Sequence, residues 1–134
     1  MKKDNKGFSL VELIIVIAIM AVLVGLLAPQ YLKYVENSKV STDISNAQEI
    51  ATAYNVAFAD DNASYKSGCT PNKMPDGKSL PALKASGAGT SWDIVIDENG
   101  VKYITDGHDE LWPDPKCTTN GVSGKTGYYN AHHK

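Results

Sequence analysis

Residues 8–28, FSLVELIIVIAIMAVLVGLLA, form an apolar run that contains one carboxylate, Glu12. No charged or strongly polar residue occurs between Leu13 and Ala28. At a rise of about 1.5 Å per residue, roughly 20 helical residues span the hydrocarbon core of a bilayer, which is about 30 Å thick. The run is therefore long enough to cross a membrane, and we expect it to be a helix with a membrane-inserted stage.

Beyond this run, apolar residues recur at every third or fourth position. They form one stripe that comprises Val40, Ile44, Ala47, Ala51, Tyr54 and Phe58. The spacing is typical of a helix face that packs against a core, and the intervening polar residues fall off that stripe: Lys39, Asp43, Asn46 and Glu49. We therefore expect one long helix over residues 8–59, ended by Asp60-Asp61-Asn62.

Pro29 lies at the junction between the apolar run and the amphipathic stretch. A proline inside a helix removes a backbone donor and clashes with the preceding turn. We expect a kink or local melting of the helix at this position.

The remaining residues are rich in Gly, Ser, Pro, Asn and Asp. Residues 92–97 place Trp92, Ile94 and Ile96 on one side and two aspartates with Val95 on the other, and residues 101–105 follow a turn signal at Asn99-Gly100. These patterns predict an antiparallel hairpin. We expect a third strand near residues 127–131, a turn-rich connection over 106–126, and a long loop over 61–90 with short structure near 80–85. The predicted fold class is α+β, with a long kinked helix packed on a small antiparallel sheet.

The chain begins with a short basic segment, residues 1–7, MKKDNKG. The whole chain carries a formal net charge of −2, has no arginine, and its lysines are scattered. A protein that binds nucleic acid usually presents a basic face with guanidinium groups that contact phosphates. The charge pattern therefore gives no support to a nucleic-acid partner.

The segment Gly7-Phe8-Ser9-Leu10-Val11-Glu12 follows this basic leader and opens the apolar run. It resembles the class III signal of type IV prepilins at every position, and Pro29 falls where many pilins have a helix-bending proline. In an ordinary secretory signal the cut follows the apolar region and removes it. Here the Gly7–Phe8 junction precedes that region, so cleavage leaves the apolar helix on the mature chain.

The resemblance implies a pilin fold with four parts: a leader over 1–7, a membrane and filament-core half-helix over 8–29, an amphipathic half-helix over 30–60, and a small β-rich head over 61–134. It implies cleavage after Gly7 by a prepilin peptidase and N-methylation of Phe8. It further implies a single-pass location in the inner or cytoplasmic membrane before assembly. An assembly ATPase and a platform protein then add the subunit to a helical homo-oligomeric filament, an extracellular pilus.

Glu12 is a carboxylate inside a membrane helix, which costs about 2.5–3.5 kcal/mol on insertion scales and usually indicates a functional contact. Cleavage before Phe8 creates an α-amino group with a reference pKa of about 7.7–8.0, still cationic near neutral pH. This amine, from the same chain or a neighbour, is a partner for Glu12. In pilins the neighbour is favoured, so pairing sets the axial register between subunits.

Three alternatives remain beside the pilus subunit. The first is a pseudopilin of a type II secretion or competence system, which no clear sequence feature separates from a pilin. The second is a membrane-anchored binding domain that is never cleaved before Phe8. In the third, the run is a simple anchor whose Glu12 reaches the headgroups. Adhesion, motility, DNA uptake and secretion all remain open as biological roles.

Cys69 and Cys117 both lie in the polar C-terminal part. Their separation fits no zinc motif, and neither has a nearby cysteine or histidine partner in sequence. If this part is exported, a disulfide is the natural interpretation; the alternative is two reduced thiols. A bridge closing a loop of about 48 residues contributes roughly 3–4 kcal/mol in the chain-entropy model.

The other polar clusters suggest weaker hypotheses. The acidic residues of 106–110, with Asp114, offer oxygens for calcium, but the spacing is not an EF-hand pattern and we expect a solvated acidic loop. His132-His133 is expected to be an exposed polar tail. Tyr31 and Tyr34 suit a membrane–water interface. No catalytic or phosphate-binding motif occurs, so we expect no enzyme activity, no cofactor and no metal.

Overall fold

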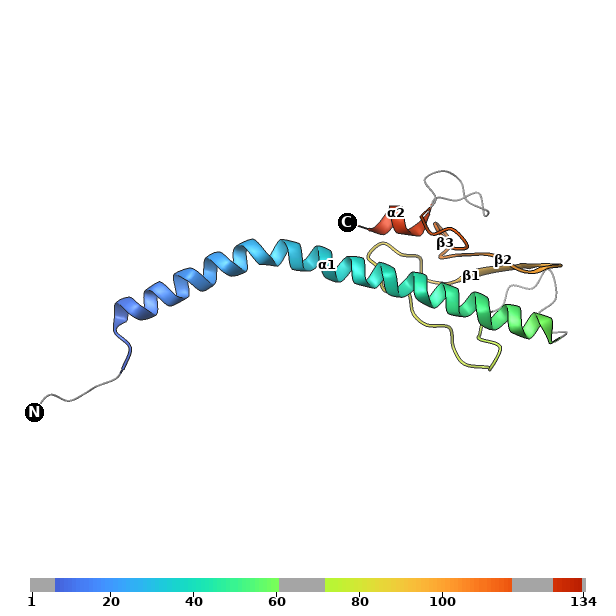
Figure 1. Ribbon diagram of the computed structural model, residues 1–134, viewed down its shortest axis with the longest axis horizontal. Coiled ribbons are helices and arrows are strands. Elements are labelled where there is room, and N and C mark those ends of the chain that lie inside the picture. Colours follow the sequence, from blue (N-terminus) through green and yellow to red (C-terminus); the bar gives the residue numbers. More distant parts are fainter. Residues whose placement is uncertain (1–6, 61–71, 117–126, 134) are drawn as a thin grey trace, which may run out of the picture. The chain divides into compact units, whose positions relative to one another are not determined.

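The computed structural model describes residues 7–60, 72–116 and 127–133. Figure 1 labels its elements, which in chain order are α1 (Leu10–Ala59), β1 (Asp93–Asp97), β2 (Gly100–Thr105), β3 (Glu110–Trp112) and α2 (Tyr128–His132). The chain divides into two compact units, Met1–Tyr34 and Val35–Lys134, and the second is called the head below. One long helix followed by a small antiparallel sheet confirms the predicted α+β class.

Helix α1 has 50 residues and continues through Pro29 without a break. It begins slightly later than expected, because Ser9 precedes the helix as its capping residue. It ends at Ala59 as predicted, and the Asp60 N–H donates to the Val56 carbonyl at 3.0 Å. The local melting expected at Pro29 does not occur, because the helix continues on both sides of the proline. A kink at Pro29 stays a prediction.

Strands β1 and β2 form the predicted antiparallel hairpin, with Ile94 opposite Ile104. The turn between them depends on two backbone features. The Asn99 N–H donates to Asp97 Oδ1 at 2.8 Å, and Gly100 has a φ of +116°, which L side chains rarely adopt. This turn closes the hairpin that positions the rest of the sheet.

The third strand lies elsewhere than expected. β3 is Glu110–Trp112, within the stretch predicted to be a turn-rich connection, and it pairs antiparallel with β2. The residues predicted as a strand near 127–131 instead form α2, a short helix in which the Tyr129 N–H donates to the Pro115 carbonyl at 2.6 Å. Gly127 alone makes a bridge to Glu110, in parallel orientation. Contacts to residues far away in sequence thus override the aromatic strand pattern.

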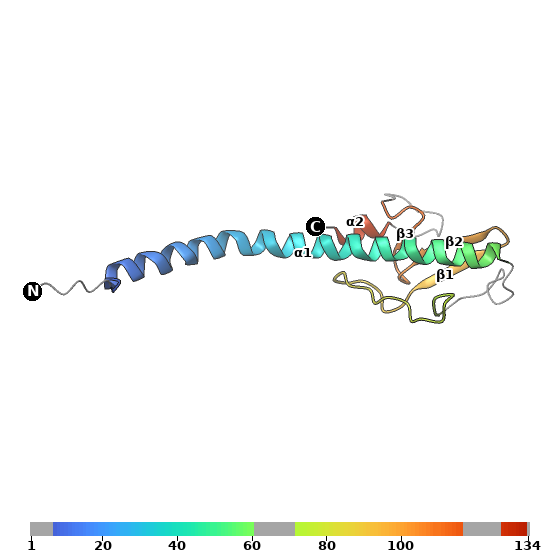
Figure 2. The same ribbon diagram turned by 60° about the horizontal axis from the view of Figure 1, so that its bottom comes forward.

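The core of the head joins one face of α1 to the sheet. Figures 1 and 2 both show residues 35–59 of α1 beside the sheet. The predicted stripe is confirmed: Val40, Ala47, Ala51 and Tyr54 are buried, while Ile44 and Phe58 are partly buried against the same cluster. The sheet side of the core contains Ile94, Ile96, Val101, Ile104 and Leu111. Each fully buried large aliphatic side chain contributes about 1.5–3 kcal/mol.

Candidate functional site

The junction between Gly7 and Phe8 lies outside the helix and is open to solvent. Gly7, Phe8 and Ser9 have no helical or strand assignment, and Phe8 is 83% exposed. No atom lies within 4 Å of the position that a Cβ on Gly7 would take. The bond between Gly7 and Phe8 is therefore accessible and lies outside regular secondary structure.

Ser9 and Glu12 form a reciprocal pair of hydrogen bonds at the start of α1. The Glu12 N–H donates to Ser9 Oγ at 3.3 Å, and the Ser9 N–H donates to Glu12 Oε2 at 3.1 Å. This is a capping box, which satisfies two backbone donors that the first turn of a helix leaves unpaired. The carboxylate also lies at the helix end where the macrodipole favours negative charge. In the single chain, Glu12 therefore has a local role.

The unit Met1–Tyr34 presents an apolar helical surface that is nowhere covered. Its large apolar side chains from Phe8 to Tyr34 are 47–83% exposed. The most apolar window of α1 has a mean hydropathy of 3.1 with none of it buried, a helix long and apolar enough to cross a membrane. Glu12 is the sole charged residue from Phe8 to Leu32. Tyr31 and Tyr34 are exposed at the polar end of this surface.

Two acids on α1 are buried, although the helical pattern assigned Asp43 to a face away from the core. Asp43 is fully buried: it accepts hydrogen bonds from the Lys84 and Ala85 N–H groups, each at 2.9 Å, and from the Tyr128 hydroxyl at 2.7 Å. One carboxylate therefore connects α1, the loop over residues 84–85 and α2. Its placement off the buried face was wrong, because its donors come from segments that the helix pattern does not include.

Glu36 lies seven residues before Asp43 and acts in the same way. It accepts a hydrogen bond from the Ser86 N–H, and the Lys39 ammonium lies 3.5 Å from its Oε2. The Ser86 N–H, with Lys39 as a smaller contributor, lowers the pKa of Glu36. Burial, followed by the Asp43 carboxylate, raises the pKa of Tyr128. The loop over residues 84–86 is thus held to α1 by carboxylates.

Residues of the acidic loop and of the C-terminus meet in the head. Asp106 is 2% exposed and His132 is 8% exposed, and the His132 Nε2 lies 3.2 Å from Asp109 Oδ2. The expectations of a solvated acidic loop and an exposed tail are therefore wrong for these residues. His133 and His108, by contrast, are exposed. The ligating atoms of Asp106, Asp109 and His132 all lie within 4.8 Å of one another.

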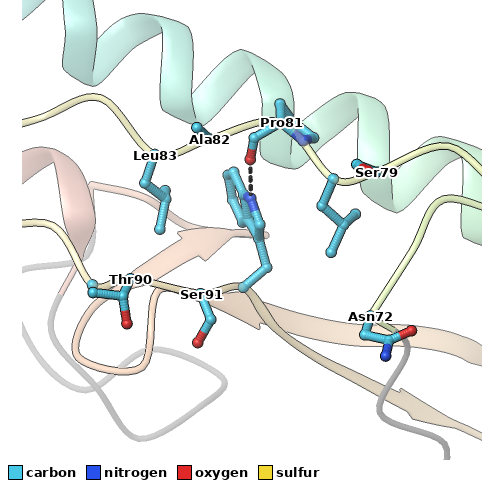
Figure 3. A pocket seen from close by; sticks show the side chains of 10 residues that line it. Asn72, Ser79, Pro81, Ala82, Leu83, Thr90 and Ser91 are labelled. Atoms are coloured by element: carbon cyan, nitrogen blue, oxygen red, sulfur yellow. Dashed lines mark hydrogen bonds between the residues drawn. The ribbon is translucent and has the colours of Figure 1, made fainter.

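A cavity of about 530 Å³ lies between two loop segments of the head, as Figure 3 shows. In its lining, the Trp92 Nε1–H donates to the Pro81 carbonyl at 2.6 Å, the bond drawn as a dashed line in Figure 3. The lining residues are Asn72, Ser79, Leu80, Pro81, Ala82, Leu83, Gly89, Thr90, Ser91 and Trp92. No acid, imidazole, amine or thiol is among these lining residues, so the hydroxyls of Ser79, Thr90 and Ser91 have no general base beside them in this cavity.

The sequence-predicted residues do not gather at one place. Gly7, Phe8 and Glu12 lie together at the start of α1, and Pro29 lies within the helix. Cys69 and Cys117 are outside the described residues, so their pairing stays a prediction. The site that the structure brings together is therefore the N-terminal junction with its capping box and uncovered helix.

Comparison with known proteins places this arrangement in a family. A family model for the prokaryotic N-terminal methylation motif matches residues 2–28. The chain is 33% identical over 116 residues to the type IV major fimbrial protein FimA of Dichelobacter nodosus, a match that covers 80% of this chain and 74% of the relative. It is 30% identical over 95 residues to a fimbrial protein of Pseudomonas aeruginosa, covering 71% of this chain and 62% of the relative.

A shorter match, 36% identical over 56 residues, relates the chain to the type IV major pilin protein PilA of Myxococcus xanthus; it covers 42% of this chain and 26% of the relative. No solved structure matches the chain with significance. The methylation motif, the uncovered helix and the extent of the FimA match agree. The chain belongs to the type IV pilin family.

Proposed function

We propose that this protein is the structural subunit of a type IV pilus and polymerises through its apolar N-terminal helix after the leader is removed. The observation that carries the proposal is the uncovered surface of that helix, whose large apolar side chains are 47–83% exposed. A contiguous apolar surface of this extent needs lipid or protein to cover it. Further copies of the same helix supply that cover in a helical homo-oligomer.

Processing begins at the Gly7–Phe8 bond. A prepilin peptidase cuts there and releases residues 1–7, and the new amino group on Phe8 is then methylated, which keeps its positive charge. The match of the methylation motif to residues 2–28 and the exposed, non-helical junction both support this step. The helix itself remains on the mature chain because it begins only at Leu10.

Glu12 sets the register of the assembled subunit. Among packed apolar helices an unpaired carboxylate is disfavoured, and removing one partner of a buried ion pair costs about 3–5 kcal/mol. The cationic amine on Phe8 of a neighbouring subunit satisfies this carboxylate at one axial position. The capping box keeps Glu12 at the start of the helix, with its carboxylate held by the Ser9 N–H until the neighbour arrives.

The membrane holds the subunit before assembly. A single pass of α1 anchors it in the inner or cytoplasmic membrane, and a pilus assembly ATPase with its platform protein moves it into the growing extracellular filament. Lipid contacts are exchanged for helix packing while the acidic heads stay outside. The proposed role is structural, and no residue is assigned to catalysis.

Two substitutions separate the charge of Glu12 from its capping role. Glu12→Gln retains an acceptor for the Ser9 N–H, because glutamine also completes a capping box, but removes the charge. Ser9→Ala breaks the capping box and keeps the charge. We expect Glu12→Gln to be inserted and cleaved normally yet to form no surface filaments, whereas Ser9→Ala assembles filaments.

Filaments are counted by electron microscopy with an antibody to the head, and cleavage is followed from the mass of the membrane-bound chain. Long labelled fibres from Glu12→Gln at the level of the unmodified protein would refute the role of the charge in register. If only Ser9→Ala lost its filaments, filament formation would depend on the helix cap and not on the charge of Glu12.

A further inference from the structure

The last helix of the chain returns to the acidic loop and places a histidine against two carboxylates. His132 Nε2 lies 3.2 Å from Asp109 Oδ2 and 4.0 Å from Asp106 Oδ2. The side chains are 9%, 14% and 0% exposed for His132, Asp109 and Asp106 respectively. Burial of two acids beside one imidazole requires compensation, because charges removed from water are costly unless they are paired or bound to a metal.

The tautomer of His132 is fixed by a backbone group. Its Nδ1 lies 3.0 Å from the Ser86 carbonyl oxygen, which only accepts hydrogen bonds, so Nδ1 carries the proton. In the neutral ring the lone pair of Nε2 then faces the two carboxylates. This Nε2 is buried and makes no hydrogen bond among the residues that the structure describes. A lone pair that faces carboxylate oxygens is unfavourable unless Nε2 binds a cation, either a proton or a metal ion.

The carboxylate of Asp106 is held in place by backbone donors. Its Oδ1 accepts from the His108 N–H at 2.8 Å and from the Asp109 N–H at 2.7 Å, and its Oδ2 accepts from the Gly89 N–H at 2.7 Å. These bonds and the Nδ1–H of His132 are the outer contacts that typically orient metal ligands in proteins. The side chains of Asp106 and His132 are thus oriented by the fold before any ion binds.

We propose that Asp106, Asp109 and His132 form a binding site for a divalent transition-metal ion of the zinc type, which clamps the C-terminal helix α2 to the loop over residues 106–109. Zinc accepts imidazole nitrogen and carboxylate oxygen together, whereas calcium takes six to eight oxygens. Tetrahedral ligands about 2.0–2.2 Å from zinc lie about 3.3–3.6 Å apart. The distance of 3.2 Å already matches this spacing, whereas the pair at 4.0 Å, in a set whose ligating atoms lie within 4.8 Å of one another, must move closer when the ion binds.

This proposal does not depend on filament assembly, because all three ligands belong to the head. The site lies next to the Asp43 contacts, because the ring centroids of Tyr128 and His132 are 4.4 Å apart within α2 and Tyr128 is hydrogen-bonded to Asp43. An ion at His132 therefore stabilises the same short helix that Asp43 holds through Tyr128.

The test uses the full chain in detergent micelles, freed of metal with a chelator and titrated with zinc chloride by calorimetry. We expect one zinc ion per chain and a rise in the thermal unfolding midpoint of the head with zinc concentration. His132→Asn retains a donor for the Ser86 carbonyl but lacks Nε2. It should weaken zinc binding by more than about 100-fold, since losing only an outer contact costs roughly 10–100-fold.

His133→Asn is the matched control, because His133 is exposed and adjacent, and it should bind zinc like the unmodified chain. Equal zinc affinity for His132→Asn and the unmodified chain would overturn the proposal, as would equal losses in both variants. Calcium that binds as tightly as zinc and is unaffected by His132→Asn would also overturn it. No saturable binding, with a head stabilised only when His132 is protonated, would show an ion pair in place of a metal site.

Discussion

Replacing Tyr128 by Phe removes one hydroxyl and leaves the ring in the core. In the head that hydroxyl donates to Asp43 Oδ2 at 2.7 Å, and both groups are buried. A hydrogen bond to a charged partner contributes about 1.5–3 kcal/mol. Asp43 keeps its two backbone donors in this variant. We expect Tyr128→Phe to lower the free energy of unfolding of the head by about 1.5–3 kcal/mol.

Asp43→Asn places an amide where the carboxylate accepts from Lys84, Ala85 and Tyr128. The NH₂ group faces at least one of these donors, and the remaining bonds lose their charge assistance. A cost of about 2–4 kcal/mol follows from one unsatisfied buried donor and the weakened bonds. Tyr128 and Asp43 share one hydrogen bond. The loss of unfolding free energy in the double variant Tyr128→Phe/Asp43→Asn should therefore be smaller than the sum of the two single losses, with a coupling energy of about 1–2 kcal/mol.

Tryptophan fluorescence reads this transition selectively. The chain has two tryptophans, and both Trp92 and Trp112 belong to the head. Urea unfolding of the full chain in detergent micelles therefore reports the head without a contribution from the apolar helix. Tyr129→Phe is the matched control, since it removes the hydroxyl of the next residue of α2 and leaves the Asp43 contacts intact.

A pH series gives a second readout. Burial and Asp43 raise the pKa of Tyr128 above its ordinary value of 10.0. Because of this shift, the protonated hydroxyl stabilises the folded head fully below pH 10, and this stabilisation is lost as the pH rises towards the folded-state pKa. Alkaline unfolding should be less steep in Tyr128→Phe. If Tyr128→Phe and Tyr129→Phe lower the free energy of unfolding equally, the Tyr128 hydroxyl has no special role. If the losses from Tyr128→Phe and Asp43→Asn simply add in the double variant, the two side chains do not stabilise the head through their hydrogen bond.

Three further predictions concern the rest of the head. The pKa of Glu36 is lowered from 4.5, so the ionised carboxylate stabilises the head above that pH and this stabilisation is lost as the pH falls through the folded-state pKa. In Glu36→Gln the free energy of unfolding should therefore depend less on pH in this range. Gly100→Ala should cost about 1–3 kcal/mol, because φ is +116° and the new Cβ meets Asn55 Oδ1 at 2.5 Å; Gly77→Ala, with φ of +85° and open space, is the control, and equal costs would exclude the Asn55 clash. A Cys69–Cys117 bridge makes the unreduced chain lighter by two hydrogen atoms, and two thiols that alkylate without reductant would exclude it.

The elements that were predictable are those specified by local patterns. The helix was visible in the apolar run and in the stripe through Val40 and Ala47, and the hairpin in the turn at Asn99-Gly100. The capping box was also present in the sequence, as Ser9 followed three residues later by Glu12, although the position of Glu12 in an apolar run favoured the Phe8 amine as its partner. Local patterns therefore define the ends of α1 as well as its length.

The elements that escaped prediction depend on long-range contacts. β3 has three residues, too few to show a period, and α2 is a five-residue helix that contacts Pro115 and Asp43. Glu36 lies four residues before the buried Val40 and Asp43 three residues after it, so both are helical neighbours of a core residue, yet acids are normally assigned to solvent. Their backbone partners lie 41–50 residues further along the chain and Tyr128 lies 85 residues beyond Asp43, so only the folded chain reveals why burial is tolerated.

The His132 cluster illustrates the same limit. His132 lies 26 positions after Asp106, and no ligand spacing joins them in sequence. The fold brings them together through α2 and the loop after β2. Sequence patterns alone favoured an exposed tail because adjacent histidines near a chain end usually are exposed.

The mass of the mature chain is the most direct test of the account. Intact-mass and fragment spectra of the protein recovered from surface filaments would identify the first residue and any group attached to it. We expect a chain that begins at N-methylated Phe8 and retains the whole apolar helix. A chain in cells that still begins at Met1 or Lys2, or one cut after residue 28, would contradict it.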